Sequence, residues 1–308
     1  MARVLVTGAS GFVGRRCLER LTAGGHDVHA VARAPGPEGG PVTWHAGDLL
    51  APGAAESLIG RIRPTHLLHL AWIATPGQFW NSTDNLAWLA AGVALADAFG
   101  RAGGRRFVGV GSCAEYDWGF GLCREDTTPL RPATPYGKAK LAMMHALDAA
   151  AALHGFDTAW GRLFFPYGPG EPAAKLIPSV VAALLDGRPV PCSHGRQVRD
   201  FVFVDDAAEA LAALVVADAT GAYNIASGEP VSLRDVIAAI AAELGGADLV
   251  RYGARAPQPG EPAVLVADMA RTAAALGWRP TVDLPTGIRR TIDAQRRARA
   301  ARPTHPAP

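Results

Sequence analysis

Short apolar runs alternate with longer amphipathic segments through the first half of the chain. The runs predict strands, and the segments between them carry apolar residues at helical spacing and end at glycine or proline. The predicted strands cover residues 3–7, 28–31, 42–46, 66–70, 106–110 and 158–162. The predicted helices cover residues 12–23, 54–61, 81–102 and 136–154. This alternation is typical of βαβ units, so the sequence predicts a parallel sheet with helices on both faces.

The pattern becomes less regular after residue 162. Further strands are predicted at residues 201–204 and 223–225. Further helices are predicted at residues 175–186, 233–244, 269–276 and 285–299, together with a core helix that starts at residue 205 and includes the apolar stretch 207–219. We therefore predict an α/β fold, a doubly wound parallel sheet with a smaller, discontinuous C-terminal α/β domain.

Composition excludes several classes of protein. The 308 residues are 49% hydrophobic, and 30 basic residues nearly balance 28 acidic ones, so no strong field attracts nucleic acid or an anionic membrane. No apolar run is long enough to span a bilayer, and the chain opens on a strand rather than a signal peptide, so we expect a cytoplasmic protein. The four cysteines lack metal-ligand spacing, which predicts reduced thiols and no metal site.

A glycine-rich turn joins the first predicted strand to the first predicted helix, in the context that a dinucleotide-binding motif requires. Gly8 permits the tight turn, Gly11 lets backbone N–H groups approach a pyrophosphate, and Gly14 lets the helix pack close to the strand. The expected cofactor contacts here are Gly8, Ser10, Gly11, Phe12, Val13 and Gly14. We therefore assign residues 1–165 plus 200–226 to a Rossmann-type NAD(P)-binding domain, residues 166–199 plus 227–295 to a substrate domain, and residues 296–308 to a flexible tail.

Two further segments are expected to contact the adenosine half of the cofactor. After the second strand, where a carboxylate would bind the 2′-hydroxyl of NAD, the chain has Ala32 and then Arg33. Because an arginine suits the 2′-phosphate of NADP, the sequence favours NADP(H), with NAD(H) as the alternative. Asp48 and Leu49 follow the third strand and are expected at the adenine edge.

Three residues form a candidate catalytic set. Ser112 follows the fifth predicted strand, at the carboxyl edge of the sheet where ligands bind in open α/β folds. Tyr136 and Lys140 are four residues apart and lie on one face of a predicted helix. A nearby ammonium lowers the pKa of a tyrosine, so we expect Tyr136 to exchange a proton with a substrate oxygen that Ser112 hydrogen-bonds. Lys140 is also expected to hold the cofactor ribose.

Taken together, these motifs resemble the extended short-chain dehydrogenases/reductases, in the branch of nucleotide-sugar epimerases, dehydratases and reductases. The resemblance covers roughly residues 2–295. Its marks are residues 7–14, Asp48-Leu49, residues 69–72, Asn85, Ser112 four residues before Tyr116, the Tyr136/Lys140 pair, and residues 167–169, 199–206 and 223–228.

The resemblance implies a role for each matching residue. Ser112, Tyr136 and Lys140 match the catalytic triad, and Ala71, between Leu70 and Trp72, matches the residue beside the nicotinamide. Arg199 matches an arginine that grips the diphosphate of a sugar nucleotide, which is suitable chemistry for a cation. The other residues expected in the substrate pocket are Cys113, Phe165, Lys175, His194 and Gln258.

The chain also departs from the family pattern. Phe165 stands where the family usually has asparagine, and Gln258 stands where an epimerase often has a second arginine. Cys113 and Ala114 occupy the places of the acidic pair of dehydratases, so a 4,6-dehydratase is not expected. Glu115 and Asp117 are carboxylates on the same loop. One interpretation is an extra acid or base, and the favoured one is that both are solvated.

Two reactions fit these residues. The favoured hypothesis is an enzyme that reduces a nucleotide-linked 4-keto-6-deoxyhexose with NADPH, with Tyr136 as the proton donor. The alternative is an NAD-dependent nucleotide-sugar 4-epimerase that passes through a 4-keto intermediate. A catalytically silent NADP-binding regulator is the hypothesis from another class. We expect a nucleotide-sugar substrate and a homodimer, and no nucleic-acid or membrane partner.

Overall fold

The larger sheet is parallel, and its strands follow the order β11-β7-β5-β4-β1-β2-β3. The computed structural model describes residues 1–34, 36–37 and 39–301. In it the strands of this sheet are β1 (Arg3–Thr7), β2 (Asp27–Ala32), β3 (Val42–Ala46), β4 (His66–His69), β5 (Arg106–Ser112), β7 (Asp157–Leu163) and β11 (Gly221–Ile225). The strand order reverses between β1 and β4, which creates the crevice at the carboxyl ends of the strands where such folds bind ligands.

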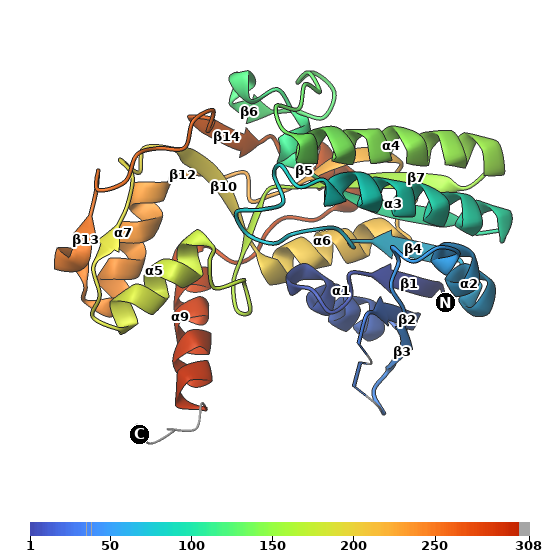
Figure 1. The fold of residues 1–308 in the computed structure, drawn as a ribbon, viewed down its shortest axis with the longest axis horizontal. Coiled ribbons are helices and arrows are strands. Elements are labelled where there is room, and N and C mark those ends of the chain that lie inside the picture. Colours follow the sequence, from blue (N-terminus) through green and yellow to red (C-terminus); the bar gives the residue numbers. More distant parts are fainter. Residues whose placement is uncertain (35, 38, 302–308) are drawn as a thin grey trace.

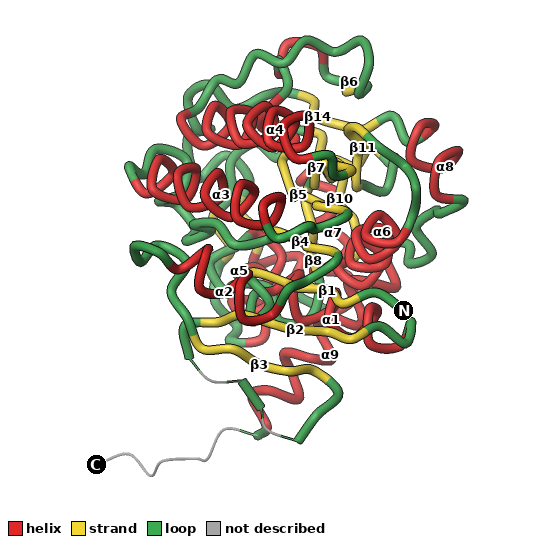
Figure 2. Tube along the Cα trace, turned by 90° about the vertical axis from the view of Figure 1, so that its right-hand side faces the viewer, coloured by secondary structure: helices red, strands yellow, loops and turns green. Residues whose placement is uncertain are grey.

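Helices cover both faces of this sheet, as Figures 1 and 2 show. One face carries α1 (Phe12–Ala23) and α6 (Val204–Val216), and the other carries α2 (Ala54–Ile62), α3 (Asp84–Arg101) and α4 (Pro135–His154). Because both faces are covered, the centre of the sheet is buried, and every residue of β5 is buried. Small residues such as Ala208 let α6 pack close to α1, where the thiol of Cys17 lies 3.9 Å from the Ala208 carbonyl oxygen.

A smaller sheet lies beside the carboxyl edge of the larger one. Its strands follow the order β12-β10-β14-β6, and β8 pairs with β10. They are β6 (Leu122–Cys123), β8 (Phe165–Tyr167), β10 (Val198–Phe203), β12 (Pro230–Ser232) and β14 (Val264–Ala267), and a separate pair is formed by β9 (Val190–Pro191) and β13 (Val250–Arg251). The helices of this part are α5 (Leu176–Leu185), α7 (Leu233–Leu244) and α9 (Leu284–Ala300), which share one apolar core. The short α8 (Ala270–Leu276) packs instead against β11.

Two buried aspartates, Asp200 and Asp206, hydrogen-bond to loops that are distant in the sequence. Asp200 accepts hydrogen bonds from the backbone N–H groups of Ser227 and Gly228, at 2.6 and 2.9 Å, and from the Ser227 hydroxyl at 2.7 Å. Asp206 accepts from the backbone N–H groups of Thr281 and Val282, at 3.1 and 2.9 Å. Buried carboxylates satisfied in this way hold loops in place, so these acidic residues serve the fold rather than the chemistry.

The structure confirms the fold class and most of the predicted elements. The sequence analysis missed the short strands of the smaller sheet, and it ended the strand of Ser112 two residues early. It also placed residues 296–300 in a flexible tail, whereas α9 continues to Ala300; the rest of the predicted tail, residues 302–308, lies outside the described residues. The division into a cofactor domain and a substrate domain stays a prediction. Within the described residues, no helix has the length and apolar character that crossing a membrane requires.

Candidate active site

The turn between β1 and α1 has the conformation that the glycine pattern predicts. Gly8 has φ of 66°, and a Cβ there would lie 2.7 Å from the backbone nitrogen of Ala71. A Cβ on Gly14 would overlap the carbonyl oxygen of Gly8, so glycine is required for α1 to pack onto the turn. Gly11 is the N-cap of α1, and no side chain caps the first helical turn. The N–H groups of that turn therefore suit a pyrophosphate.

The remaining predicted residues of this turn lie where α1 begins. Ser10 is exposed, and its carbonyl oxygen accepts a 2.9 Å hydrogen bond from Nε of Arg15. Phe12 and Val13 form the first turn of α1 and are half-buried. The turn therefore presents backbone rather than charged side chains to a phosphate group, as the sequence predicts.

Thr7 belongs to this region, although the sequence analysis gave it no role. Its Oγ1 lies 2.8 Å from Nδ1 of His69 and accepts a 3.2 Å hydrogen bond from the backbone N–H of Ala71. This fixes the end of β1 against Leu70, Ala71 and Trp72, the segment expected beside the nicotinamide. Burial, together with the charge of Lys140, lowers the pKa of His69 to about 3, so its imidazole is neutral at physiological pH.

The residues expected at the adenosine half lie at the opposite end of the crevice. Ala32 is the last residue of β2, and Arg33 follows it with an exposed side chain. Asp48 and Leu49 line a shallow pocket with Val31, Ala46, Gly47, Ala54, Ser57, Leu58 and Arg61. One carboxylate oxygen of Asp48 accepts the backbone N–H of Leu50 at 3.0 Å, which shapes the turn. The second and third strands therefore end beside one pocket, as the sequence predicts.

Tyr136 lies in the first turn of α4. Thr134 caps this helix by accepting the backbone N–H of Gly137 at 3.1 Å, and Pro135 fixes its first residue. The backbone N–H of Tyr136 donates to the carbonyl oxygen of Trp80 at 3.1 Å. The Tyr136 ring packs edge-to-face against Phe79 and Trp80, with centroids 4.9 and 5.6 Å apart. These contacts hold the Tyr136 hydroxyl at the crevice.

The sequence analysis expected Lys140 to lower the pKa of Tyr136, but in the structure without a cofactor this pKa is raised. Burial raises the pKa of Tyr136, and the neighbouring Ser112 hydroxyl only partly opposes this effect. The Lys140 ammonium is directed elsewhere, because Nζ donates to the carbonyl oxygen of Val110 at 2.8 Å and lies 4.0 Å from the centroid of the Trp72 ring. Tyr136 is therefore protonated at neutral pH.

Lys140 is almost fully buried, with 4% of its surface exposed. Burial lowers its pKa to about 7, and the negative charge of Glu115 acts in the opposite direction. A lysine in this state changes charge near physiological pH, which is typical of active sites.

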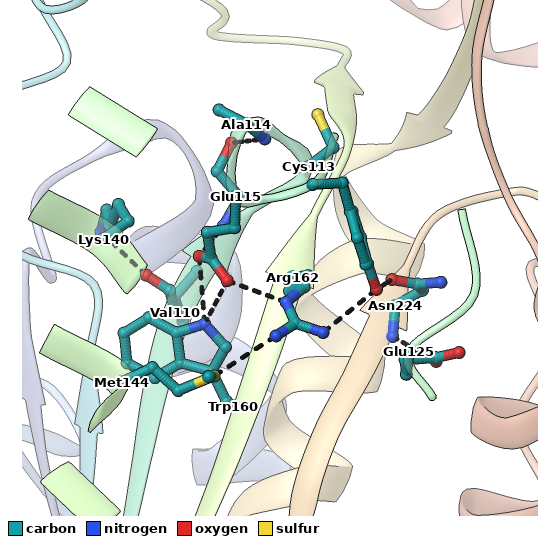
Figure 3. Close-up of polar contacts among 12 residues, drawn as sticks. Val110, Cys113, Ala114, Glu115, Glu125, Lys140, Met144, Trp160, Arg162 and Asn224 are labelled. Carbon is teal, nitrogen blue, oxygen red and sulfur yellow. Dashed lines mark hydrogen bonds and ion pairs between the residues drawn. The ribbon is translucent and has the colours of Figure 1, made fainter. Parts of the chain in front are cut away.

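Ser112 ends β5 and caps the short helical turn that follows it. Its hydroxyl accepts the backbone N–H of Ala114 at 3.2 Å, and its own N–H donates to Oε1 of Glu115 at 2.8 Å. Glu115 is fully buried and forms a 2.8 Å ion pair with Arg162, which is also buried (Figure 3). The prediction that Glu115 is solvated was therefore wrong, because Arg162 of β7 and the indole of Trp160 supply its hydrogen bonds. Asp117 is partly exposed and caps the next turn.

Two predicted substrate residues approach the catalytic side of the crevice. Lys175 lies with Nζ 5.2 Å from the centroid of Phe79, the ring that packs against Tyr136. Cys113 is a buried free thiol directly after Ser112, and its pKa is raised by burial. Phe79 therefore contacts both Lys175 and Tyr136, while Cys113 is next to Ser112 in the chain.

Arg199 and Phe165 form a second group at the smaller sheet. The guanidinium of Arg199 lies 5.7 Å from the centroid of Phe165. It also forms a 2.8 Å ion pair with Glu261, a residue that the sequence analysis did not single out. Arg199 is buried, and Phe165 packs against the buried apolar cluster that contains Cys113, so this group adjoins the first one.

Within the described residues, His194 and Gln258 form no hydrogen bond with Ser112, Tyr136 or Lys140. The carbonyl oxygen of His194 accepts from Arg234 at 3.4 Å, and its Nδ1 accepts the backbone N–H of Arg196 at 3.0 Å. Gln258 is exposed, and its carbonyl oxygen accepts the backbone N–H of Glu261 at 3.2 Å. The roles of both residues stay predictions.

Comparison with known proteins shows the family. The profile of the NAD dependent epimerase/dehydratase family matches residues 4–226. The chain belongs to this family. A dTDP-L-rhamnose 4-epimerase of Burkholderia thailandensis is 27% identical to this chain, and the match covers 93% of both chains. A dTDP-glucose 4,6-dehydratase of Neisseria meningitidis is 26% identical, and the match covers 95% of this chain and 92% of the relative. The solved structure of MoeE5 in complex with UDP-glucuronic acid and NAD is 32% identical, covers 96% of this chain and 99% of its own, and superposes with a TM-score of 0.84.

Membership makes the chain an NAD(P)-dependent enzyme of the short-chain dehydrogenase/reductase type. The structure fits such a cofactor, since side chains at Gly8 and Gly14 would fill the space between the turn, α1 and the segment of Ala71. When bound, the dinucleotide would be held at its pyrophosphate by the N–H groups of the first turn of α1. Among the residues that the structure describes, no group of three His, Cys, Asp or Glu side chains is placed to hold a metal ion.

Proposed function

We propose that this enzyme transfers a hydride between a nicotinamide cofactor and C4 of a nucleotide-linked hexose. The observation that carries the proposal is the placement of Ser112, Tyr136 and Lys140 at the carboxyl edge of the sheet, beside the turn that suits a pyrophosphate. A nucleotide-sugar substrate is supported by the UDP-glucuronic acid bound to MoeE5 and by the sugar nucleotides in the names of the two relatives.

Each residue of the proposed site has a separate role in the reaction. The cofactor, when bound, supplies or accepts the hydride. In the reductive direction Tyr136 donates its hydroxyl proton to the hexose oxygen, and the raised pKa of this tyrosine keeps that proton in place at neutral pH. Ser112 hydrogen-bonds the same oxygen, and Lys140 binds the cofactor ribose. Arg199 and Lys175 supply positive charge for the diphosphate.

The net reaction that we favour is the reduction of a 4-keto-6-deoxyhexose by NADPH. Hydride adds to the carbonyl carbon, Tyr136 gives its proton to the carbonyl oxygen, and solvent returns a proton to Tyr136. The products are the alcohol and the oxidised cofactor. The preference for NADPH is supported by Ala32 at the end of β2, where no carboxylate would oppose a 2′-phosphate, and by the adjacent Arg33.

The second candidate is a 4-epimerase that retains NAD. It is favoured by the similarity to a dTDP-L-rhamnose 4-epimerase along nearly the whole chain and by the NAD in the MoeE5 complex. This reaction requires Tyr136 as the phenolate, which the positive charge of an oxidised nicotinamide would favour. The phenolate would accept the proton of the C4 hydroxyl and return it after the keto sugar has turned over. The same three residues serve both reactions. The two reactions differ in the cofactor, because the reductase consumes NADPH whereas the epimerase regenerates its bound NAD.

The test incubates the purified enzyme with nucleotide-linked 4-keto-6-deoxyhexoses and NADPH, and follows absorbance of the reduced nicotinamide. Loss of NADPH in proportion to alcohol formed is the expected result. Interconversion of nucleotide hexoses without added cofactor, by protein that carries bound NAD, would instead establish the epimerase. If neither reaction occurs with any nucleotide hexose, the assignment to C4 of a nucleotide sugar is wrong.

A binding experiment separates the cofactor question from turnover. Titration with NADPH and NADH, followed by protein fluorescence, should show tighter binding of NADPH. Arg33→Ala should remove this preference, whereas Arg105→Ala, at the opposite end of the parallel strands, should not. Tighter binding of NADH by the parent enzyme would overturn the argument from Arg33.

A further inference from the structure

The buried ion pair behind Ser112 is made possible by two glycines of β5. Gly109 and Gly111 pair with Trp160 and Arg162 of β7, and a Cβ on either glycine would overlap the Trp160 indole. The indole therefore lies flat against β5, and its Nε1 donates to both oxygens of the Glu115 carboxylate, at 3.1 and 3.0 Å. The carboxylate also accepts hydrogen bonds from Arg162 and from the backbone N–H of Ser112, so three residues hold it in place.

Glu115 is joined directly to the proposed catalytic serine. Its Oε1 accepts the backbone N–H of Ser112, while the Ser112 hydroxyl caps the same short helical turn from its other end. This reciprocal arrangement is a capping box, and it fixes the backbone from which the Ser112 hydroxyl points. A change in the Glu115 side chain therefore moves or loosens Ser112.

Glu115 also acts on Lys140. The groups around the Lys140 ammonium are otherwise neutral: the Val110 carbonyl oxygen, the face of Trp72 and the imidazole of His69. Glu115 supplies the negative charge that favours the ammonium form. Figure 3 shows Lys140 and Arg162 on opposite sides of the Glu115 carboxylate, so the ion pair presents its negative end to Lys140.

We propose that Glu115 is a positioning residue of this active site, which fixes Ser112 through its backbone and places the negative end of the ion pair on the side of Lys140. This inference rests on the proposed catalytic role of Ser112 and Lys140. Glu115 does not touch the crevice, since it is fully buried, and so it acts only through these two residues.

The elements packed around Glu115 and Lys140 contribute the following charged and titratable side chains. Arg162 of β7 pairs with Glu115 and donates to the Tyr116 hydroxyl at 3.1 Å. His69 of β4 and Tyr136 of α4 carry no charge at neutral pH. Loss of the carboxylate alone would leave the buried Arg162 guanidinium without an opposite charge, which destabilises the folded state. A second variant must therefore remove both charges.

The experiment compares Glu115→Gln with the double variant Glu115→Gln/Arg162→Met, in which neither charge remains. Asp117→Asn is the control, because it removes a carboxylate two residues away on the same loop. The chain has only three lysines, Lys138, Lys140 and Lys175, so NMR of Nζ- and Cε-labelled lysine can follow each one, with assignment by Lys→Arg variants. The pH midpoint of Lys140 is the primary readout.

We expect the Lys140 midpoint to fall by about one pH unit in both Glu115 variants, and not in Asp117→Asn. The exposed Lys138 should not change in any of them. The dissociation constant of the preferred dinucleotide should match that of the parent at about pH 5 and rise several-fold at about pH 7.5, where less Lys140 is charged. The double variant should recover the unfolding midpoint of the parent but not its Lys140 midpoint.

Two results would overturn the inference. One is a Lys140 midpoint in the double variant equal to that of the parent. The other is parental dinucleotide binding across the same pH range. If Glu115→Gln does not fold, the double variant decides. Because neither readout requires a substrate, failure of the proposed sugar chemistry would leave these results interpretable, and the two failures can be distinguished.

Discussion

The side-chain amide of Asn85 accepts a 2.8 Å hydrogen bond from the indole Nε1 of Trp72. Its amide nitrogen donates to the carbonyl oxygens of Phe79 and Ser82, at 2.7 and 2.9 Å. Trp72 faces the Lys140 ammonium, and Phe79 packs against Tyr136, so one buried residue of α3 supports the surroundings of both.

We expect Asn85→Ala to lower the free energy of unfolding by about 1–3 kcal/mol, because it leaves buried hydrogen-bonding groups without partners. Urea denaturation measures the change. Asn81→Ala is the control, since Asn81 is exposed, and its effect should stay within about 0.5 kcal/mol. Equal stability of the two variants would show that the Asn85 contacts do not matter.

Gly14→Ala should abolish dinucleotide binding, because the new Cβ would overlap the Gly8 carbonyl oxygen and push α1 away from the turn. Gly60→Ala is a matched control in α2, where a Cβ meets no atom within 4 Å. That control should be more stable than the parent by about 0.5–1 kcal/mol, since alanine is the better helix former. Calorimetric titration and denaturant unfolding measure the two effects, and parental affinity in Gly14→Ala would contradict the packing argument.

Tyr136→Phe should lower kcat by about 10²–10⁴-fold, because it removes the proposed proton donor and keeps the ring. Its contacts with Phe79 and Trp80 remain, so dinucleotide affinity and stability should be close to those of the parent. Tyr252→Phe, which removes a hydroxyl bound to the Arg234 carbonyl oxygen, should leave kcat unchanged. Activity that survives in Tyr136→Phe would assign the proton transfer to another group.

Glu171 predicts a specific dependence of stability on pH. Burial raises its pKa from 4.5 to about 8, although the nearby Lys175 ammonium opposes the shift. The folded chain thus holds one more proton than the unfolded chain between these values, and the contribution of Glu171 to stability is lost as the pH rises through about 8. Glu171→Gln cannot ionise and avoids this loss. The difference in Tm, variant minus parent, should therefore increase from about pH 5 to about pH 9; a constant difference would show that Glu171 is ionised throughout.

The sequence alone predicted most of the larger sheet and the three candidate catalytic residues. These features depend on local signals: apolar runs that end at glycines, the turn from Gly8 to Gly14, and the four-residue spacing of Tyr136 and Lys140 on one helix. Their geometry follows from the regular rise of a helix or a strand, and the structure places them accordingly. The sequence analysis missed β6, β8 and β12 of the smaller sheet because strands of 2 or 3 residues are too short to show a period.

Only the tertiary structure decided which charges are buried and which direction each pKa takes. Glu115 belongs to a polar loop in the sequence, and its partner Arg162 is 47 residues away on a different strand. The two meet because β5 and β7 are neighbours in the sheet and because Gly109 and Gly111 leave room for the Trp160 indole. Likewise, the spacing of Tyr136 and Lys140 predicted a lowered tyrosine pKa, but burial outweighed it. Desolvation depends on every atom packed around a group, and no local pattern along the chain contains that information.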